Sequence, residues 1–135
     1  MANKKIAGSG FHHIALRAHD YDKTFEFYTK ALGFEPKLCW GEGDSRAAML
    51  DIGDGGCVEI FAGGGKEQPA GMFWHLAFKT SDPDGAYEAA IKGGATSNKT
   101  PYDTVIKGAQ KSLPVRLAFV NGPDGELLEF FCEKQ

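Results

Sequence analysis

Apolar and polar positions along this chain fall into short alternating segments, interrupted once in each half by a longer segment with helical spacing. In the first half the segments predict a strand, a helix and three strands, at 11–18, 21–32, 35–40, 46–52 and 57–61. In the second half the equivalent segments lie at 73–80, 83–92, 98–104 (the weakest), 115–120 and 127–132. Turns rich in Gly, Asp and Pro separate them. The order β-α-β-β-β is therefore predicted twice.

Aspartates stand where both helices should begin. Asp20 or Asp22 can cap the first helix, and Asp82 can cap the second. Pro83 then occupies the first turn of the second helix, a position that proline favours.

The halves also repeat particular residues. A shift of 62 positions (75 − 13) aligns HIALR at 13–17 with HLAFK at 75–79. A shift of 70 positions (129 − 59) aligns Glu59 with Glu129. Core packing alone does not call for His or Glu inside apolar strands, so their repetition suggests a shared polar centre. Two imidazoles and two carboxylates are suitable ligands for a divalent metal.

Side-chain direction along a strand refines this interpretation, because successive residues point to opposite faces. His13, Ala15 and Arg17 share one face of the first strand, and Ile14 and Leu16 share the other. The first strand of the second half repeats this pattern. We expect the large apolar residues to pack on the helices. The face with His and the small Ala is expected to line a cavity.

The length of 135 residues predicts one domain spanning 1–135. Within it we expect module one at about 11–62, a Gly-rich linker at about 63–72, and module two at about 73–133.

Composition narrows the class of protein. A hydrophobic fraction of 42% and a net charge of −3 fit an ordinary globular domain, and neither a basic stripe nor a long apolar run argues for nucleic acid or membrane. The three cysteines are too few and too widely spaced for a disulfide framework, so reduced thiols and a cytoplasmic location are expected.

Four segments together resemble the vicinal oxygen chelate superfamily: HIALRAHDYDKTFEFYTKALGF, VEIF, HLAFKTSDPD and NGPDGELLEFF. Glyoxalase I, fosfomycin and bleomycin resistance proteins, methylmalonyl-CoA epimerase and extradiol dioxygenases belong to this superfamily. The resemblance covers roughly residues 11–133. It implies an α+β fold in which two tandem βαβββ modules form a curled mixed sheet, or half-barrel, around one metal site.

The resemblance also implies site residues. The metal ligands would be His13, Glu59, His75 and Glu129, the set found in glyoxalase I, where the metal is Ni or Zn. Extradiol dioxygenases instead use two His and one carboxylate on iron, and epimerases tend to carry an amide at the position of Glu59. A ligand glutamate doubles as the catalytic base in glyoxalase I; by analogy this is Glu129, with Glu59 as its near-symmetric partner. Arg17 matches a position that contacts the carboxylate of glutathione, which is implied as a thiol cosubstrate.

Two departures from the glyoxalase I pattern concern glutathione more than the metal. Gly63 stands where bacterial glyoxalase I usually has an Asn that helps to hold glutathione. The last turn reads PDGELLE, without the usual aromatic or basic residue after PDG.

The leading hypothesis is a metal-dependent lyase or isomerase of glyoxalase I type, acting on a small α-oxo thiol adduct through a metal-bound enediolate. One alternative is a binding or resistance protein that sequesters a drug-like small molecule; another is an iron-dependent dioxygenase of the same superfamily. We expect a homodimer, and the site can lie within one chain or across the dimer.

Simpler roles compete for individual residues. A lone strand His is more often a core residue than a ligand, and Arg17 could pair with a helix carboxylate. His12 should point away from His13 as a surface or packing residue, and His19 should be a solvated loop residue.

Overall fold

The computed structural model describes residues 3–5, 7, 9, 11–68, 71, 73–109 and 111–134. Over these residues, none of the helices has both the length and the apolar character needed to cross a membrane.

The first half of the chain forms module one. Its elements, in chain order, are β1 (His13–Arg17), α1 (Tyr21–Glu26), a π-helical turn η1 (Phe27–Ala31), β2 (Glu35–Trp40), a short 3-10 turn η2 (Gly43–Ser45), β3 (Ala47–Asp51) and β4 (Cys57–Phe61). The sheet has the order β1-β4-β3-β2. Strand β1 runs parallel to β4, and the other neighbours are antiparallel.

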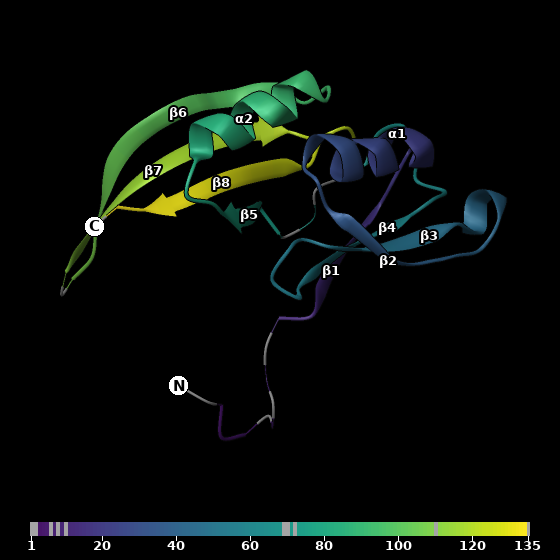
Figure 1. The fold of residues 1–135 in the computed structure, drawn as a ribbon, viewed down its shortest axis with the longest axis horizontal. Coiled ribbons are helices and arrows are strands. Elements are labelled where there is room, and N and C mark those ends of the chain that lie inside the picture. The colour runs from purple at the N-terminus through teal and green to yellow at the C-terminus, as the bar shows by residue number, and fades with distance from the viewer. Residues whose placement is uncertain are drawn as a thin grey trace.

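The second half repeats this arrangement as module two. Its elements are β5 (Leu76–Lys79), α2 (Pro83–Lys92), β6 (Thr96–Lys107), β7 (Ser112–Asn121) and β8 (Leu127–Glu133). The sheet order is β5-β8-β7-β6, again with one parallel pair, β5 and β8. The predicted α+β fold of two tandem βαβββ modules is confirmed (Figure 1). Within one chain the modules keep two separate four-stranded sheets, so the continuous half-barrel is not formed there.

Aspartate caps begin both helices, as predicted. The carboxylate of Asp20 accepts the N–H of Lys23 at 3.2 Å, and that of Asp82 accepts the N–H of Gly85 at 3.0 Å. Pro83 follows Asp82 in the first turn, where the backbone N–H that proline lacks would have no partner within the helix. These two caps fix where the chain leaves β1 and β5, and therefore where the residues on those strands lie.

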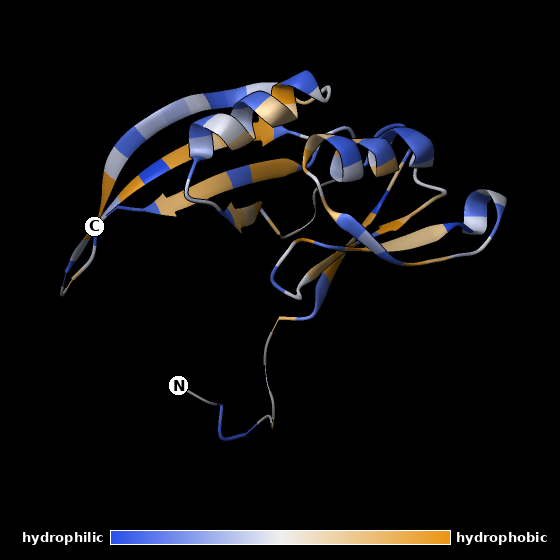
Figure 2. Cartoon of the chain, in the orientation of Figure 1, coloured by the Kyte–Doolittle hydropathy of each residue, from blue (hydrophilic) through white to orange (hydrophobic). Residues whose placement is uncertain are grey.

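Strand β6 is longer than the weak strand predicted at 98–104. It is the outer strand of its sheet, and its side chains are exposed or half-buried along its length, so no alternation marks it in the sequence. Pro101 is accommodated because the pairing register with β7 shifts between Lys99 and Tyr102. Figure 2 shows β6 as largely hydrophilic, in contrast to the apolar β8.

The predicted alternation of faces holds on the inner strands. Val58 and Ile60 of β4, and Leu128 and Phe130 of β8, are buried in one core together with residues of the helices. Burying side chains of this size contributes about 1.5–3 kcal/mol each to folding. Because the helix-facing sides of both sheets join this single core, the opposite sides point away from it.

Aromatic and polar contacts join the two modules. The rings of Phe34 and Phe78 meet edge to face, with centroids 5.2 Å apart. The hydroxyl of Tyr28 donates to the carboxylate of Glu126 at 2.6 Å. Burial raises the pKa of the Glu126 carboxyl, and the hydrogen bond from Tyr28 opposes that rise. The modules are therefore held together through the side that carries α1 and η1.

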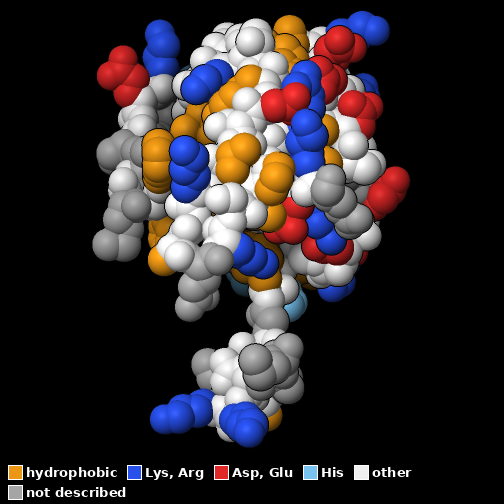
Figure 3. Space-filling view, turned by 90° about the vertical axis from the view of Figure 1, so that its left-hand side faces the viewer, with side chains coloured by type: hydrophobic (Ala, Val, Ile, Leu, Met, Phe, Trp, Pro, Cys, Tyr) orange, Lys and Arg blue, Asp and Glu red, His pale blue; other side chains and the backbone are white. Residues whose placement is uncertain are grey.

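Charges of both signs are mixed with apolar side chains on the end of the molecule shown in Figure 3. This mixture agrees with the small net charge of the sequence.

Candidate metal centre

The first candidate pair lies on β1 and β4. The parallel register places Ala15 opposite Glu59, with His13 two residues earlier on the same face as Ala15. Because Ala15 is small, the imidazole and the carboxylate can approach across it. The Nε2 atom of His13 lies 3.5 Å from Oε2 of Glu59. Glu59 is only 7% exposed, so its carboxylate is a buried polar group with the imidazole as its near neighbour.

The second pair lies at the equivalent positions of module two. Ala77 is opposite Glu129 in the register of β5 and β8. His75 immediately precedes β5, since the strand begins at Leu76 rather than at residue 73 as predicted. Its Nε2 atom lies 3.2 Å from Oε1 of Glu129, which is 6% exposed. The duplication seen in the sequence is therefore a duplication of geometry.

The surroundings of the two imidazoles differ. The Nδ1 atoms of His12 and His13 are 2.9 Å apart, and their rings meet edge to face. His75 has aromatic neighbours instead: its ring centroid is 5.0 Å from that of Trp74 and 5.9 Å from that of Phe119. His13 therefore has a polar ring partner, whereas the ring partners of His75 are aromatic, and both histidines are exposed.

The glutamates also face different residues across the sheet. Met49 of β3 is opposite Glu59, and Phe119 of β7 is opposite Glu129. Burial raises the pKa of the Glu129 carboxyl, and the nearby His75 partly offsets this rise. A carboxylate with a raised pKa is a stronger base than an ordinary glutamate.

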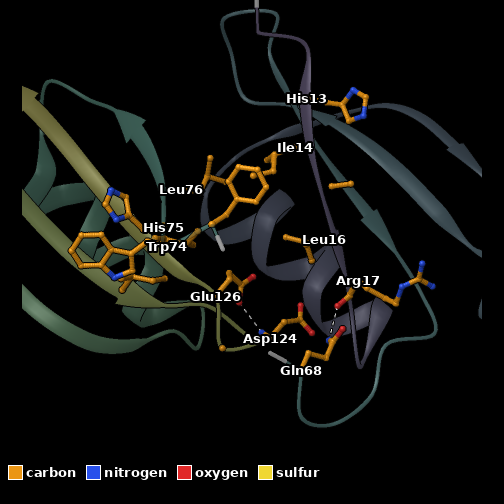
Figure 4. A pocket seen from close by; sticks show the side chains of 15 residues that line it. His13, Ile14, Leu16, Arg17, Gln68, Trp74, His75, Leu76, Asp124 and Glu126 are labelled. Atoms are coloured by element: carbon orange, nitrogen blue, oxygen red, sulfur yellow. Dashed lines mark hydrogen bonds between the residues drawn. The ribbon is translucent and has the colours of Figure 1, made fainter. Parts of the chain in front are cut away.

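The two pairs do not meet within one chain. Figure 4 shows His13 and His75 on opposite sides of the space between the modules. In the described ranges, with their gaps at both termini, 69–70, 72 and 110, no group of three or more His, Cys, Asp or Glu is close enough to hold a metal ion. The structure thus brings His13 to Glu59 and His75 to Glu129, but one chain does not bring the pairs together.

A cavity of about 550 Å³ lies between the modules and reaches both faces of β1. Ile14 and Leu16 point into it, and Leu76 lies across from them (Figure 4). His13, Ala15 and Arg17 of β1 and His75 are also among its lining residues, so the expectation that the His face lines a cavity is confirmed in part. Strands β1 and β5 are both edge strands, and the cavity lies between them where the two sheets diverge.

Arg17 lies at the end of β1, exposed, on the same face as His13. Its guanidinium makes no hydrogen bond or ion pair with any residue that the structure describes, so the predicted salt bridge to a helix carboxylate is not found. Gly63 lies beside it: a Cβ on Gly63 would be 3.9 Å from Nη1 of Arg17. Gly63 has φ +86° and its Cβ would approach the carbonyl oxygen of Asp44 to 3.3 Å, so the local backbone disfavours an Asn there.

Two residues near the pairs were not identified from the sequence. His12 was predicted to point away from His13, but it precedes the strand, so the alternation of faces does not apply to it. Phe119 carried no sequence signal beyond that of an ordinary apolar residue in a predicted strand. The sequence signal that could have identified His12 is its position directly before another histidine, His13.

The donor atoms fit a divalent metal. Zinc binds His nitrogen at about 2.0–2.1 Å and carboxylate oxygen at about 2.0–2.2 Å, so two such ligands at a tetrahedral angle lie about 3.4 Å apart. The separations of 3.5 and 3.2 Å in the two pairs are close to this value. Each pair supplies two ligands, fewer than the three or four that zinc sites use.

Comparisons with known proteins agree with the fold. The sequence model of the Glyoxalase/Bleomycin resistance protein/Dioxygenase superfamily matches residues 10–130. The uncharacterized protein YwbC of Bacillus subtilis (strain 168) is 30% identical over 124 residues, which cover 88% of this chain and 94% of YwbC. A probable lactoylglutathione lyase of Vibrio parahaemolyticus is 30% identical over 131 residues, covering 91% of this chain and 90% of the relative.

A solved structure gives the same picture of the fold. The glyoxylase/bleomycin resistance protein/dioxygenase domain from Frankia sp. EAN1pec superposes with a TM-score of 0.73 at 21% identity. The match covers 93% of this chain and 98% of that domain.

Proposed function

Since this chain belongs to the glyoxalase/bleomycin resistance protein/dioxygenase superfamily, we propose that it is a metal-dependent lyase or isomerase of glyoxalase I type. Its substrate would be a small α-oxo thiol adduct. The observation that carries this proposal is the pairing of a His nitrogen with a buried Glu oxygen at equivalent positions of both modules. A relative named probable lactoylglutathione lyase supports the same activity.

One divalent cation, Ni or Zn, would be held by His13, Glu59, His75 and Glu129. Since the two pairs lie apart in one chain, we propose that a homodimer assembles each site from module one of one chain and module two of the other. Both pairs lie beside edge strands, β1 and β5, which can meet a second copy. Phe73 and Trp74 are 75% and 78% exposed next to His75, and large exposed aromatics of this kind favour contact with a partner.

The bound metal would act as a Lewis acid toward two adjacent substrate oxygens. The chain's own residues would move the proton. Glu129 would take it from the thiol-bearing hemithioacetal carbon, which is next to the carbonyl, and would return it to that carbonyl carbon. The raised pKa of Glu129 suits this role, because a base works best when its pKa is near the operating pH. This carboxylate is only 6% exposed and lies opposite Phe119 of β7.

Arg17 would bind a carboxylate of the thiol cosubstrate, such as that of glutathione. Its guanidinium is exposed on the His13 face. Arg is suited to this role because its planar donors match a carboxylate in two parallel hydrogen bonds.

The test is turnover of the hemithioacetal of methylglyoxal and glutathione after chelation and reloading with Ni or Zn. Activity should depend on the metal and should be lost when His13→Ala is combined with Glu129→Ala. His19→Ala is the matched control, because His19 lies in the loop after β1 and should leave turnover unchanged. Full activity in the double variant would overturn the proposal.

The cavity between the modules favours a second candidate, a protein that binds an apolar or drug-like molecule. Its walls include Ile14, Leu16 and Trp74. A protein of this kind would purify without metal, and its ligand would quench the emission of Trp74 but not that of Trp40, which does not line the cavity. Quenching in a Trp40→Phe variant that persists without any metal would favour this second function.

A further inference from the structure

His12 contacts the proposed metal ligand His13 through one particular ring atom. The Nδ1 atoms of the two imidazoles are 2.9 Å apart, a hydrogen-bond distance. The Nε2 atom of His13, on the far side of the same ring, faces the carboxylate of Glu59 at 3.5 Å. His12 and Glu59 therefore contact opposite ends of the His13 ring, His12 at Nδ1 and Glu59 at Nε2.

The backbone holds His12 in place for this contact. Its carbonyl oxygen accepts the N–H of Cys57 at 2.9 Å, and Cys57 is also the register partner of His13. This bond extends the pairing of β1 and β4 by one residue without making His12 part of the strand. The ring of His12 is thus free to turn toward His13 and meets it at 82°.

A hydrogen bond between two Nδ1 atoms requires one proton and one lone pair. A neutral imidazole that binds a metal through Nε2 must keep its own proton on Nδ1. If His13 donates from Nδ1, then His12 accepts at Nδ1 and carries its proton on Nε2. This arrangement leaves the lone pair on Nε2 of His13 directed toward Glu59.

On the basis of the proposed metal site, we infer that His12 is a positioning residue for His13. It accepts the Nδ1–H of His13, selects the tautomer that binds metal through Nε2, and fixes the orientation of the ring. Metal-binding histidines commonly donate their second N–H to a carboxylate or a carbonyl. In module one a second imidazole fills this place. In module two Trp74 stands before His75, and an indole, which has no acceptor nitrogen, cannot accept this bond.

Substitutions of His12 separate the hydrogen bond from the bulk of the ring. The Oδ1 atom of Asn is attached to the side chain at the same position as Nδ1 of His, so His12→Asn keeps an acceptor where His13 needs one. His12→Leu keeps similar volume and removes the acceptor. His12 is exposed, so neither change should disturb the core.

The first measurement is the affinity of the full-length protein for Ni²⁺ and for Zn²⁺ alone, by competition with a chelator. His12→Leu should weaken binding about 10–100-fold, and His12→Asn should stay within about threefold of wild type. His19→Leu, the same change at an exposed histidine in the loop after β1, removes no acceptor from His13 and should not reproduce the loss. Unchanged affinity in His12→Leu, or equal losses in the Leu and Asn variants, would overturn the inference.

The second measurement needs no variant. Nitrogen NMR of the zinc-loaded protein, at a pH where His12 is neutral, distinguishes a protonated ring nitrogen from a bare one. The Nδ1 atom of His12 should be bare, with its proton on Nε2, and finding that proton on Nδ1 would contradict the inference. A wild-type protein that binds no divalent metal would overturn the proposed function, and the role of His12 with it. Normal wild-type binding that is unaffected in His12→Leu would overturn the role of His12 alone.

Discussion

The two His–Glu pairs of this protein share a backbone plan and differ in what surrounds them. Both arise where a parallel strand pair brings an alanine opposite a glutamate, and both glutamates are buried. In module one the histidine has another imidazole at its Nδ1 atom. In module two the histidine contacts the rings of Trp74 and Phe119, and burial raises the pKa of Glu129.

This difference shows that the two modules place their His and Glu side chains alike but surround them with different residues. Strand register sets where a donor atom lies. The residue before each histidine and the residue opposite each glutamate differ between the modules. Under the proposed function both modules would hold the cation, and module two, where burial raises the pKa of Glu129, would also supply the base. The account predicts that equivalent substitutions in the two modules have unequal effects.

The largest difference in kcat between equivalent variants should follow from replacing each glutamate in turn. Glu129→Gln should lower kcat of the metal-loaded protein about 10³-fold, because the catalytic base is lost. Glu59→Gln should lower it only about tenfold, because an amide oxygen can still serve as a ligand. Metal content is measured on each sample, so that kcat refers to loaded sites. Equal losses, or a larger loss for Glu59→Gln, would contradict the division of roles.

A smaller effect should follow from exchanging the residues opposite the glutamates. Phe119→Met gives Glu129 the neighbour that Glu59 has, reduces its desolvation and makes it a weaker base, so kcat should fall about threefold. Met49→Phe is the matched change in module one and should leave kcat nearly unchanged. Steady-state kinetics of the two variants provide the test. A greater loss in Met49→Phe would reverse the assignment of the base.

The smallest expected effect is on the free energy of unfolding of the metal-free protein. Since burial raises the pKa of Glu129, the folded protein keeps that proton at a pH where the unfolded chain has released it. The stabilisation from Glu129 is complete below its unfolded pKa of about 4.3 and is lost as pH rises through the higher folded pKa. Wild type should therefore lose stability relative to Glu129→Gln over this range.

Urea unfolding at several pH values, with a chelator present, measures this difference. Glu133→Gln, an exposed change on the same strand, should show no such trend. A stability difference between wild type and Glu129→Gln that grows in favour of wild type as pH rises would show that the pKa is lowered instead.

Local patterns in the sequence were sufficient to predict the modules. The caps at Asp20 and Asp82, and the inward residues Val58 and Leu128, depend on contacts within a few residues or on simple alternation. Strand β2 was predicted with the bounds it has, Glu35–Trp40. The pairing of His13 with Glu59 also followed, because parity and strand order determine which side chains share a face.

Other features depend on interactions that a single sequence does not display. The division of the strands into two sheets and the contact of Phe34 with Phe78 between the modules are not encoded by any periodicity. The contact of His12 with His13 depends on β1 starting at residue 13, and strand ends are the least predictable part of a pattern. The length of β6 was missed because an outer strand with polar side chains on both faces carries no alternation.

The central claim is that one pair from each module, on different chains, completes the site. Mixing His13→Ala with His75→Ala tests it directly, since each homodimer lacks a ligand in both sites. In a mixed dimer with shared sites, one site combines both defects and the other combines the two intact modules. Random association should then restore about a quarter of wild-type activity and metal binding. A mixture of His13→Ala with Glu59→Ala, both in module one, should restore nothing. Recovery in the first mixture alone is the predicted result, and no recovery in either would contradict a site shared between chains.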